Sequence, residues 1–190
     1  MPKLWHDTIA AHRNAVADAI MDRTATMAAA EGIPALTMAR IATETGIGRA
    51  TLYKYFKDVQ QILAAWHRRQ IEAHLGDLED IRRRAVSPLA GLEAVLLAYA
   101  QHTAHNHHGT LGHLLHATPH VHEAHEHLQA FVTEIIAAAQ RSGELPRTAP
   151  AGELARFALA AMQPMPQIPS KAAATRLVGF VLAGLGASRR

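Results

Sequence analysis

The apolar positions of the chain recur at the three- and four-residue spacing of helices, not at the alternating spacing of strands. One such stripe predicts a first helix over residues 8–31, with Asp7 as its N-cap. The members of this stripe are Val16, Ile20, Thr24 and Met27. A second stripe predicts a long helix over residues 59–84, capped by Asp58, and consists of Ile62, Leu63, Trp66, Ile71, Leu75 and Leu78. Because runs of β-branched residues are absent, we predict an all-α protein.

Between these two helices, residues 37–56 predict two short helices joined by a tight turn. Ile41 and Ala42 give the first short helix an apolar face, and Leu52, Tyr55 and Phe56 give one to the second. The turn is Gly46-Ile47-Gly48, and glycine permits the left-handed backbone that ends a helix. The second helix also carries Arg49, Thr51, Tyr53 and Lys54. This arrangement is typical of a helix-turn-helix that binds DNA.

Serine, threonine and proline mark the starts of the later helices. These signals are Ser87-Pro88, Thr118-Pro119, Pro150 and Ser170. We expect helices over residues 89–105, 119–141, 150–162 and 171–187, and a short one near 111–116. Three prolines within residues 163–169 exclude a helix there. The chain is therefore predicted to form about nine helices and no strand.

Composition narrows the setting in which the protein works. The 190 residues contain no cysteine, which excludes disulfides and thiolate metal sites and agrees with a reducing cytoplasm. The N-terminal residues lack the apolar core of a signal peptide. The longest C-terminal apolar stretch, residues 177–187, is too short to span a bilayer. We expect a cytoplasmic protein without a membrane partner.

Positive charge is concentrated around the predicted helix-turn-helix. The net charge of the whole chain is only +3. Residues 37–69, however, contain two acidic residues, Glu44 and Asp58, against the basic residues Arg40, Arg49, Lys54, Lys57, Arg68 and Arg69. Residues 86–190 are close to balanced. A local basic face of this kind suits a module that contacts phosphates.

Several of these residues stand in a pattern that resembles the tetracycline-repressor (TetR) family. The pattern consists of Leu36-Thr37, Ile41-Ala42, Gly46 and Leu52-Tyr53-x-Tyr55-Phe56. The resemblance implies a three-helix DNA-binding head, residues 1–56, and a helical body, residues 57–190, that dimerises and binds a ligand. It also implies that Thr37, Tyr53 and Tyr55 contact phosphates.

The predicted DNA contacts come from both short helices and from the residues that follow them. Arg49 and Lys54 can bond guanine edges or phosphates, and Thr51 can pack on a thymine methyl group. The full set is Thr37, Arg40, Arg49, Thr51, Tyr53, Lys54, Tyr55 and Lys57. Two positions depart from the family pattern. Gly48 stands where a capping serine is usual, and Val59 stands where a phosphate-binding lysine is usual, a contact that we expect Lys57 to replace.

The resemblance also implies two further partners, a second copy of the chain and a small-molecule effector. The last two helices are expected to form the homodimer through two stripes. An intramolecular core is the alternative, and both can hold. The stripes are Leu154, Phe157, Ala158, Ala161 and Met162, and Leu177, Val178, Val181, Leu182 and Leu185. The candidate effector contacts are Trp66, His67, Tyr99, His102, Leu115, Phe131 and Met162.

Ten of the 14 histidines fall between His102 and His127. They could form a metal site, line a polar ligand pocket, or lie on a solvated surface. The metal candidates are the i, i+3 pairs His102/His105, His113/His116 and His122/His125. The pattern lacks the histidine spacing of a zinc hydrolase. We predict no bound metal or cofactor, and a metal-responsive regulator or a helical metal-binding protein remains the alternative.

An enzyme is not indicated, because the chain has no nucleophile–base pair, phosphate-binding glycine loop or paired-carboxylate motif. The sequence predicts a transcriptional regulator. We expect a repressor that a small-molecule effector releases from an inverted-repeat DNA operator.

Overall fold

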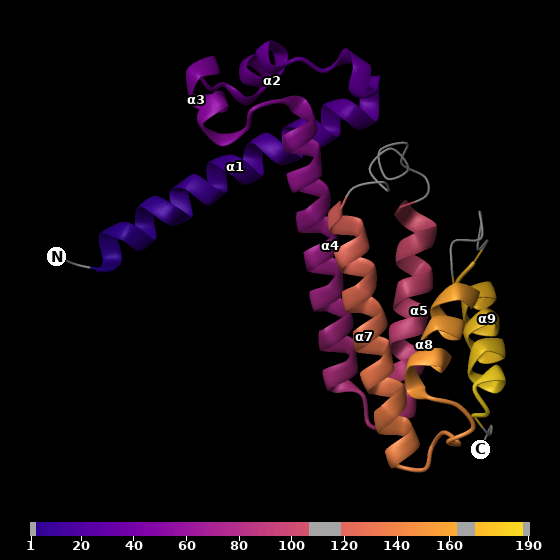
Figure 1. Cartoon of the computed structure of the whole chain (residues 1–190). Coiled ribbons are helices and arrows are strands. Elements are labelled where there is room, and N and C mark those ends of the chain that lie inside the picture. Colours follow the sequence, from indigo (N-terminus) through magenta and orange to yellow (C-terminus); the bar gives the residue numbers. More distant parts are fainter. Residues whose placement is uncertain (1–2, 107–118, 163–169, 188–190) are drawn as a thin grey trace. The chain divides into compact units, whose positions relative to one another are not determined.

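The computed structural model describes residues 3–106, 119–162 and 170–187, and these residues form helices joined by short connections (Figure 1). Within these ranges there are eight α-helices, one 3-10 turn and no strand. The predicted all-α class is therefore confirmed for the described chain. The short helix expected near residues 111–116 lies outside the described residues.

The N-terminal unit comprises the described residues up to Gln70. Its elements are α1 (Lys3–Glu31), η1 (Ile33–Ala35), α2 (Met38–Thr45), α3 (Arg49–Tyr55) and the first part of α4 (Val59–Arg84). Helix α1 begins at Lys3, so the prediction that Asp7 caps it is wrong, because Asp7 lies inside the helix. Nothing in residues 3–6 interrupts a helix, so the first turn continues towards the N-terminus past this potential cap.

The core of this unit gathers the apolar faces that the sequence predicted. Ile20, Ile41, Leu52, Ile62 and Leu63 are at most 1% exposed and pack in one cluster. The buried Thr24 on α1 donates its hydroxyl to the carbonyl oxygen of Ile20 at 2.7 Å, so its burial leaves no unsatisfied donor.

Glycine and short polar side chains end and start the helices of the head. Gly46 has φ 71° after α2; its N–H donates to the carbonyl of Thr43, and that of Ile47 donates to the carbonyl of Ala42. This pair of bonds is a Schellman motif, which satisfies the last carbonyls of α2. Asp58 caps α4, accepting a 2.7 Å hydrogen bond from the backbone N–H of Gln61, as predicted.

The C-terminal unit consists of the rest of α4, from Ile71, with α5 (Pro88–Asn106), α7 (Pro119–Arg141), α8 (Ala151–Ala161) and α9 (Lys171–Gly184). Helix α5 packs against α7 and α9, and α8 packs against α7 and α9 (Figure 1). The core includes Leu78, Leu92, Leu96, Val132, Ile135, Ile136, Leu159 and Val178.

Serine caps begin two helices of this body as predicted. The hydroxyl of Ser87 accepts from the N–H of Ala90 at 3.3 Å, and that of Ser170 accepts from the N–H of Ala173 at 3.2 Å. No helix of the described chain has both the length and the apolar character that crossing a bilayer requires.

The boundary between the two units falls within α4, between Gln70 and Ile71. Residues 59–70 of this helix therefore pack with the head, whose cluster includes Ile62, Leu63 and Trp66. A functional division between residues 56 and 57 stays a prediction.

Candidate nucleic-acid interface

Helix α3 has one buried side and one exposed polar side. Leu52, on the predicted apolar face, is 0% exposed, whereas Tyr53 is 55% exposed. The exposed side of α3 carries Arg49, Thr51, Tyr53 and Lys54. Within the described residues no carboxylate forms an ion pair with Arg49 or Lys54. The helix therefore offers cations, hydroxyls and an aromatic ring to solvent on a buried apolar base.

The start of α3 lacks a side-chain cap. Gly48 occupies the N-cap position with φ −65° and ψ 143°, an extended backbone that any residue adopts. The N–H groups of the first turn of α3 therefore have no side-chain acceptor from residue 48. This agrees with the expectation that Gly48 caps the helix less well than serine.

The remaining predicted DNA contacts lie at or near the ends of the two short helices. The hydroxyl of Thr37 accepts from the backbone N–H of Arg40 at 3.2 Å and caps α2. Before α4, the backbone N–H of Lys57 donates to the side-chain oxygen of Gln61 at 2.6 Å. The side chain of Lys57 is exposed, and Tyr55 is half-buried beside the head core.

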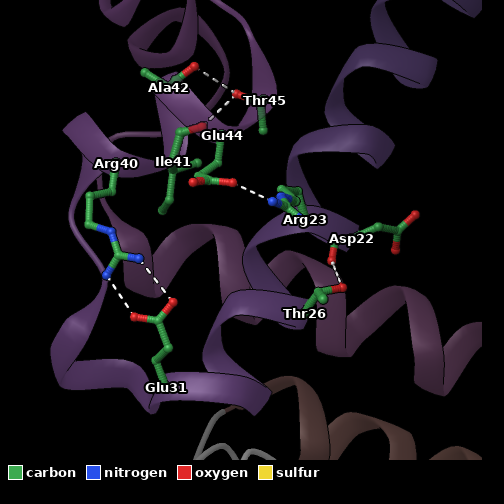
Figure 2. Close-up of polar contacts among 9 residues, drawn as sticks. All are labelled: Asp22, Arg23, Thr26, Glu31, Arg40, Ile41, Ala42, Glu44 and Thr45. Atoms are coloured by element: carbon green, nitrogen blue, oxygen red, sulfur yellow. Dashed lines mark hydrogen bonds and ion pairs between the residues drawn. The ribbon is translucent and has the colours of Figure 1, made fainter.

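The structure places Arg40 differently from the other candidates. Its guanidinium forms two 2.9 Å hydrogen bonds to the carboxylate of Glu31 (Figure 2). It donates a third, of 3.1 Å, to the carbonyl oxygen of Ala35. The hydrogen bond from Arg40, together with its charge, lowers the pKa of Glu31 below the usual 4.5. Arg40 is thus engaged with the end of α1, while Arg49 and Lys54 are not.

A second ion pair joins the other end of α2 to α1, between Glu44 and Arg23 (Figure 2). A third fastens α4 to α1, where Arg69 binds Asp18 at 2.6 Å and also binds Asp22. Sequence analysis missed these pairs, because their partners are far apart in the chain and meet only once the helices are packed.

One further cation near α3 was also missed. The guanidinium carbon of Arg13 lies 6.0 Å from the centre of the Tyr55 ring. Arg13 lies three residues before Val16, on the face of α1 that contacts the head core. The spacing from Val16 predicts on which side of α1 Arg13 lies, but it does not predict that Arg13 contacts Tyr55 on α3.

Comparison with known proteins finds a match for the head of the chain. Residues 20–66 match the sequence profile described as "Bacterial regulatory proteins, tetR family". In this segment the chain is similar to TetR-family regulators. Its head is a helix-turn-helix DNA-binding domain, and the α2–turn–α3 geometry described above lies within the matched residues.

Solved structures agree in fold over almost the whole chain. A TetR/AcrR-family transcriptional regulator from Thermobifida fusca is 18% identical, with a TM-score of 0.76 over 92% of this chain and 98% of that one. SmeT, the repressor of a Stenotrophomonas maltophilia multidrug efflux pump, is 19% identical, with a TM-score of 0.69 over 88% and 89%. The ketosteroid regulator KstR2 of Mycobacterium tuberculosis is 18% identical, with a TM-score of 0.62 over 91% and 95%. No curated protein matches the sequence.

The candidate effector residues that the structure describes are divided between the two units. Phe131 and Met162 are 7% and 0% exposed and belong to the body core. Trp66 packs against the head core. Burial raises the pKa of Tyr99 above its usual 10. His67 is half-buried, and the side chains of His102 and Leu115 lie outside the described residues.

A hollow of about 310 Å³ opens instead between α4 and α5. Its lining residues are His74, Asp77, Leu78, Asp80, Ile81, Arg84, Ala98 and Gln101. None of the predicted effector contacts whose side chains the structure describes lines it. Sequence analysis could not find this hollow, because the hydrophobic pattern of each helix does not say which helix faces it.

The described histidines do not form a metal centre. No three potential ligands from histidine, aspartate and glutamate gather within the described ranges. His122 lies 3.4 Å from Glu126, and His127 lies 3.8 Å from Glu79, while His125 is exposed on α7. The side chains of His102, His105, His113 and His116 lie outside the described residues.

The two C-terminal stripes are mostly used inside this chain. Ala158, Met162, Val178, Val181, Leu182 and Leu185 are all buried in the body core. Phe157, a member of the first stripe, is 50% exposed, and Phe180, which belongs to neither stripe, is 70% exposed. Gly184 lies under Phe157, since a Cβ there would stand 3.2 Å from two of its ring carbons. A dimer contact through α8 and α9 stays a prediction.

Proposed function

We propose that this protein is a dimeric transcriptional repressor that binds an inverted-repeat DNA operator through α3. The observation that carries the proposal is the exposed polar side of α3 on a buried apolar base. Arg49 and Lys54 bond guanine edges or phosphates in the major groove, and Thr51 and Tyr53 contact phosphates or a thymine methyl group. Thr37, Tyr55 and Lys57 add phosphate contacts at the edges of the groove.

A single head contacts only a few base pairs, so specificity requires two. TetR-family regulators act as dimers. We assign the dimer contact to α8 and α9 around Phe157 and Phe180, because monomeric proteins rarely expose two large aromatic side chains on neighbouring helices without a partner. The two recognition helices then bind half-sites about 34–36 Å apart, or somewhat more.

The third part of the proposal is release by a small molecule. TetR-family regulators bind small-molecule effectors. Within the described part of the chain, we assign this site to the hollow between α4 and α5. Its lining combines apolar side chains with polar ones, as ligand sites do. The apolar ones include Leu78, Ile81 and Ala98, and the polar ones include Asp77 and Gln101. An effector releases DNA only if it binds the DNA-incompetent state more tightly than the DNA-bound state. Such a protein works in the cytoplasm, where its DNA is.

The test uses duplex DNA from immediately upstream of the protein's own gene in a gel-shift assay. Wild type is compared with Arg49→Ala and Tyr53→Ala. Arg141→Gln, which removes an exposed cation from α7 in the body, is the matched control. We expect the two α3 variants to lose binding by tenfold or more and the control to keep it. Unchanged binding in both α3 variants rules out α3 as the recognition helix.

A further inference from the structure

The strongest unexplained feature of the head is the way α2 is held at both ends by α1. At its N-terminal end, Arg40 binds the carboxylate of Glu31 through two hydrogen bonds. At its C-terminal end, Glu44 pairs with Arg23. The two α1 residues lie about two helical turns apart. Between these two ion pairs, Ile41 is buried in the head core, with 0% of its surface exposed.

The two ion pairs have opposite polarity. At one end α1 supplies the carboxylate and α2 the guanidinium, and at the other end the roles are exchanged (Figure 2). A slide or a tilt of α2 along α1 would separate both pairs or bring like charges together. The arrangement therefore specifies one position of α2 on α1, as complementary and repulsive charges do at specific interfaces.

The contacts of Arg40 make it unsuitable as a free DNA-binding cation. Its two terminal nitrogens already donate three hydrogen bonds, to Glu31 and to the carbonyl of Ala35. The carboxylate of Glu31 also pairs with its positive charge. Bidentate arginine–carboxylate pairs are also the geometry in which a partly exposed ion pair holds its position.

The same residue also touches the predicted phosphate-binding end of α2. The backbone N–H of Arg40 donates to the hydroxyl of Thr37, which caps that end. Its side chain thus ties the capped first turn of α2 to Glu31 at the end of α1. Movement of this turn would displace Thr37 and, through the tight turn at Gly46, helix α3.

We propose that Glu31 and Arg40 are positioning residues for DNA recognition: their pair seats α2 on α1, and Arg40 does not contact DNA. This inference rests on the proposed function and replaces the expectation that Arg40 approaches the DNA backbone. It distinguishes Arg40 from Arg49 and Lys54, which act on DNA directly.

The experiment starts with a duplex that the full-length wild-type protein selects from a randomised DNA pool. Dissociation constants for this duplex and for a shuffled duplex are measured by fluorescence anisotropy at several salt concentrations. The variants are Arg40→Gln, Arg40→Glu, Glu31→Arg and the double variant Glu31→Arg/Arg40→Glu. The ratio of the two dissociation constants measures specificity, and it cancels the general attraction between a changed net charge and DNA.

A positioning role predicts that each single charge reversal lowers the specificity ratio by about tenfold, and that the double variant returns to within about threefold of wild type. It also predicts that Arg40→Gln leaves the salt dependence of binding unchanged. A phosphate contact predicts the opposite pattern: Arg40→Gln weakens binding to both duplexes equally, the salt slope falls by about 0.9 per subunit, and the double variant is not rescued.

The second pattern overturns the proposal. A thermal melt of each variant accompanies the binding data, and rescue in the double variant separates positioning from a general loss of folding. If the wild-type protein enriches no duplex, the proposed function itself fails, and this inference fails with it. If the wild-type protein enriches a duplex but the double variant does not regain specificity, only the positioning role of Glu31 and Arg40 fails.

Discussion

Replacing Gly46 tests whether the turn between α2 and α3 depends on left-handed backbone. Gly46 has φ 71°, and a Cβ added there meets no atom within 4 Å. A substitution at this position therefore changes backbone strain without creating a steric clash. Alanine in this conformation costs about 1–2 kcal/mol. The lower entropy of its unfolded chain offsets about 0.4–1 kcal/mol of that cost.

We therefore expect Gly46→Ala to lower the free energy of unfolding of the head by about 1 kcal/mol. Asparagine tolerates left-handed backbone, so Gly46→Asn is the matched control and should cost clearly less. Urea unfolding is followed by the fluorescence of Trp66, which packs against the head core. A Trp5→Phe background leaves Trp66 as the only tryptophan, since the chain contains two.

Two results would refute this reasoning. If Gly46→Ala is as stable as wild type, the turn does not depend on glycine. If Gly46→Asn is as destabilised as Gly46→Ala, the cost comes from adding a side chain and not from the backbone conformation.

Three more predictions concern single side chains. Phe180→Asp should give monomers at micromolar concentration in sedimentation velocity; a dimer that persists would move the interface away from α9. Arg13→Gln should reduce the salt slope of operator binding by about 0.9 per subunit, if its position beside Tyr55 places it near a phosphate; an unchanged slope, as expected for an Arg141→Gln control, would remove it from the interface. Gly48→Ser should raise the free energy of unfolding by a few tenths of a kcal/mol in urea titration, because serine caps α3; a less stable protein would contradict this.

The parts of the fold that depend on local chemistry were predictable from the sequence. Asp58, Ser87 and Ser170 accept the capping hydrogen bonds that their positions suggested. The spacing of apolar residues on α3 predicted that Leu52 is buried. Such features need only the residues of one helix and its ends.

The features that depend on which helices meet were not predictable. Helix α8 is apolar on more than one side, so the sequence alone does not say that Ala158 faces the core and Phe157 faces outward. The pair of Arg40 with Glu31 requires the chain to reverse through Gly32 and η1 before α2 begins. For the same reason Arg40 looked like a free cation in the sequence.

The central claim is that two copies of α3 bind two matching half-sites on DNA. The most direct measurement is to select duplexes from a randomised pool with the purified full-length protein and to sequence those that are enriched. The account predicts an inverted repeat whose half-site centres lie about one helical turn of DNA apart, or somewhat more, and loss of enrichment with Arg49→Ala. No enrichment, or a single motif without an inverted partner, would contradict it.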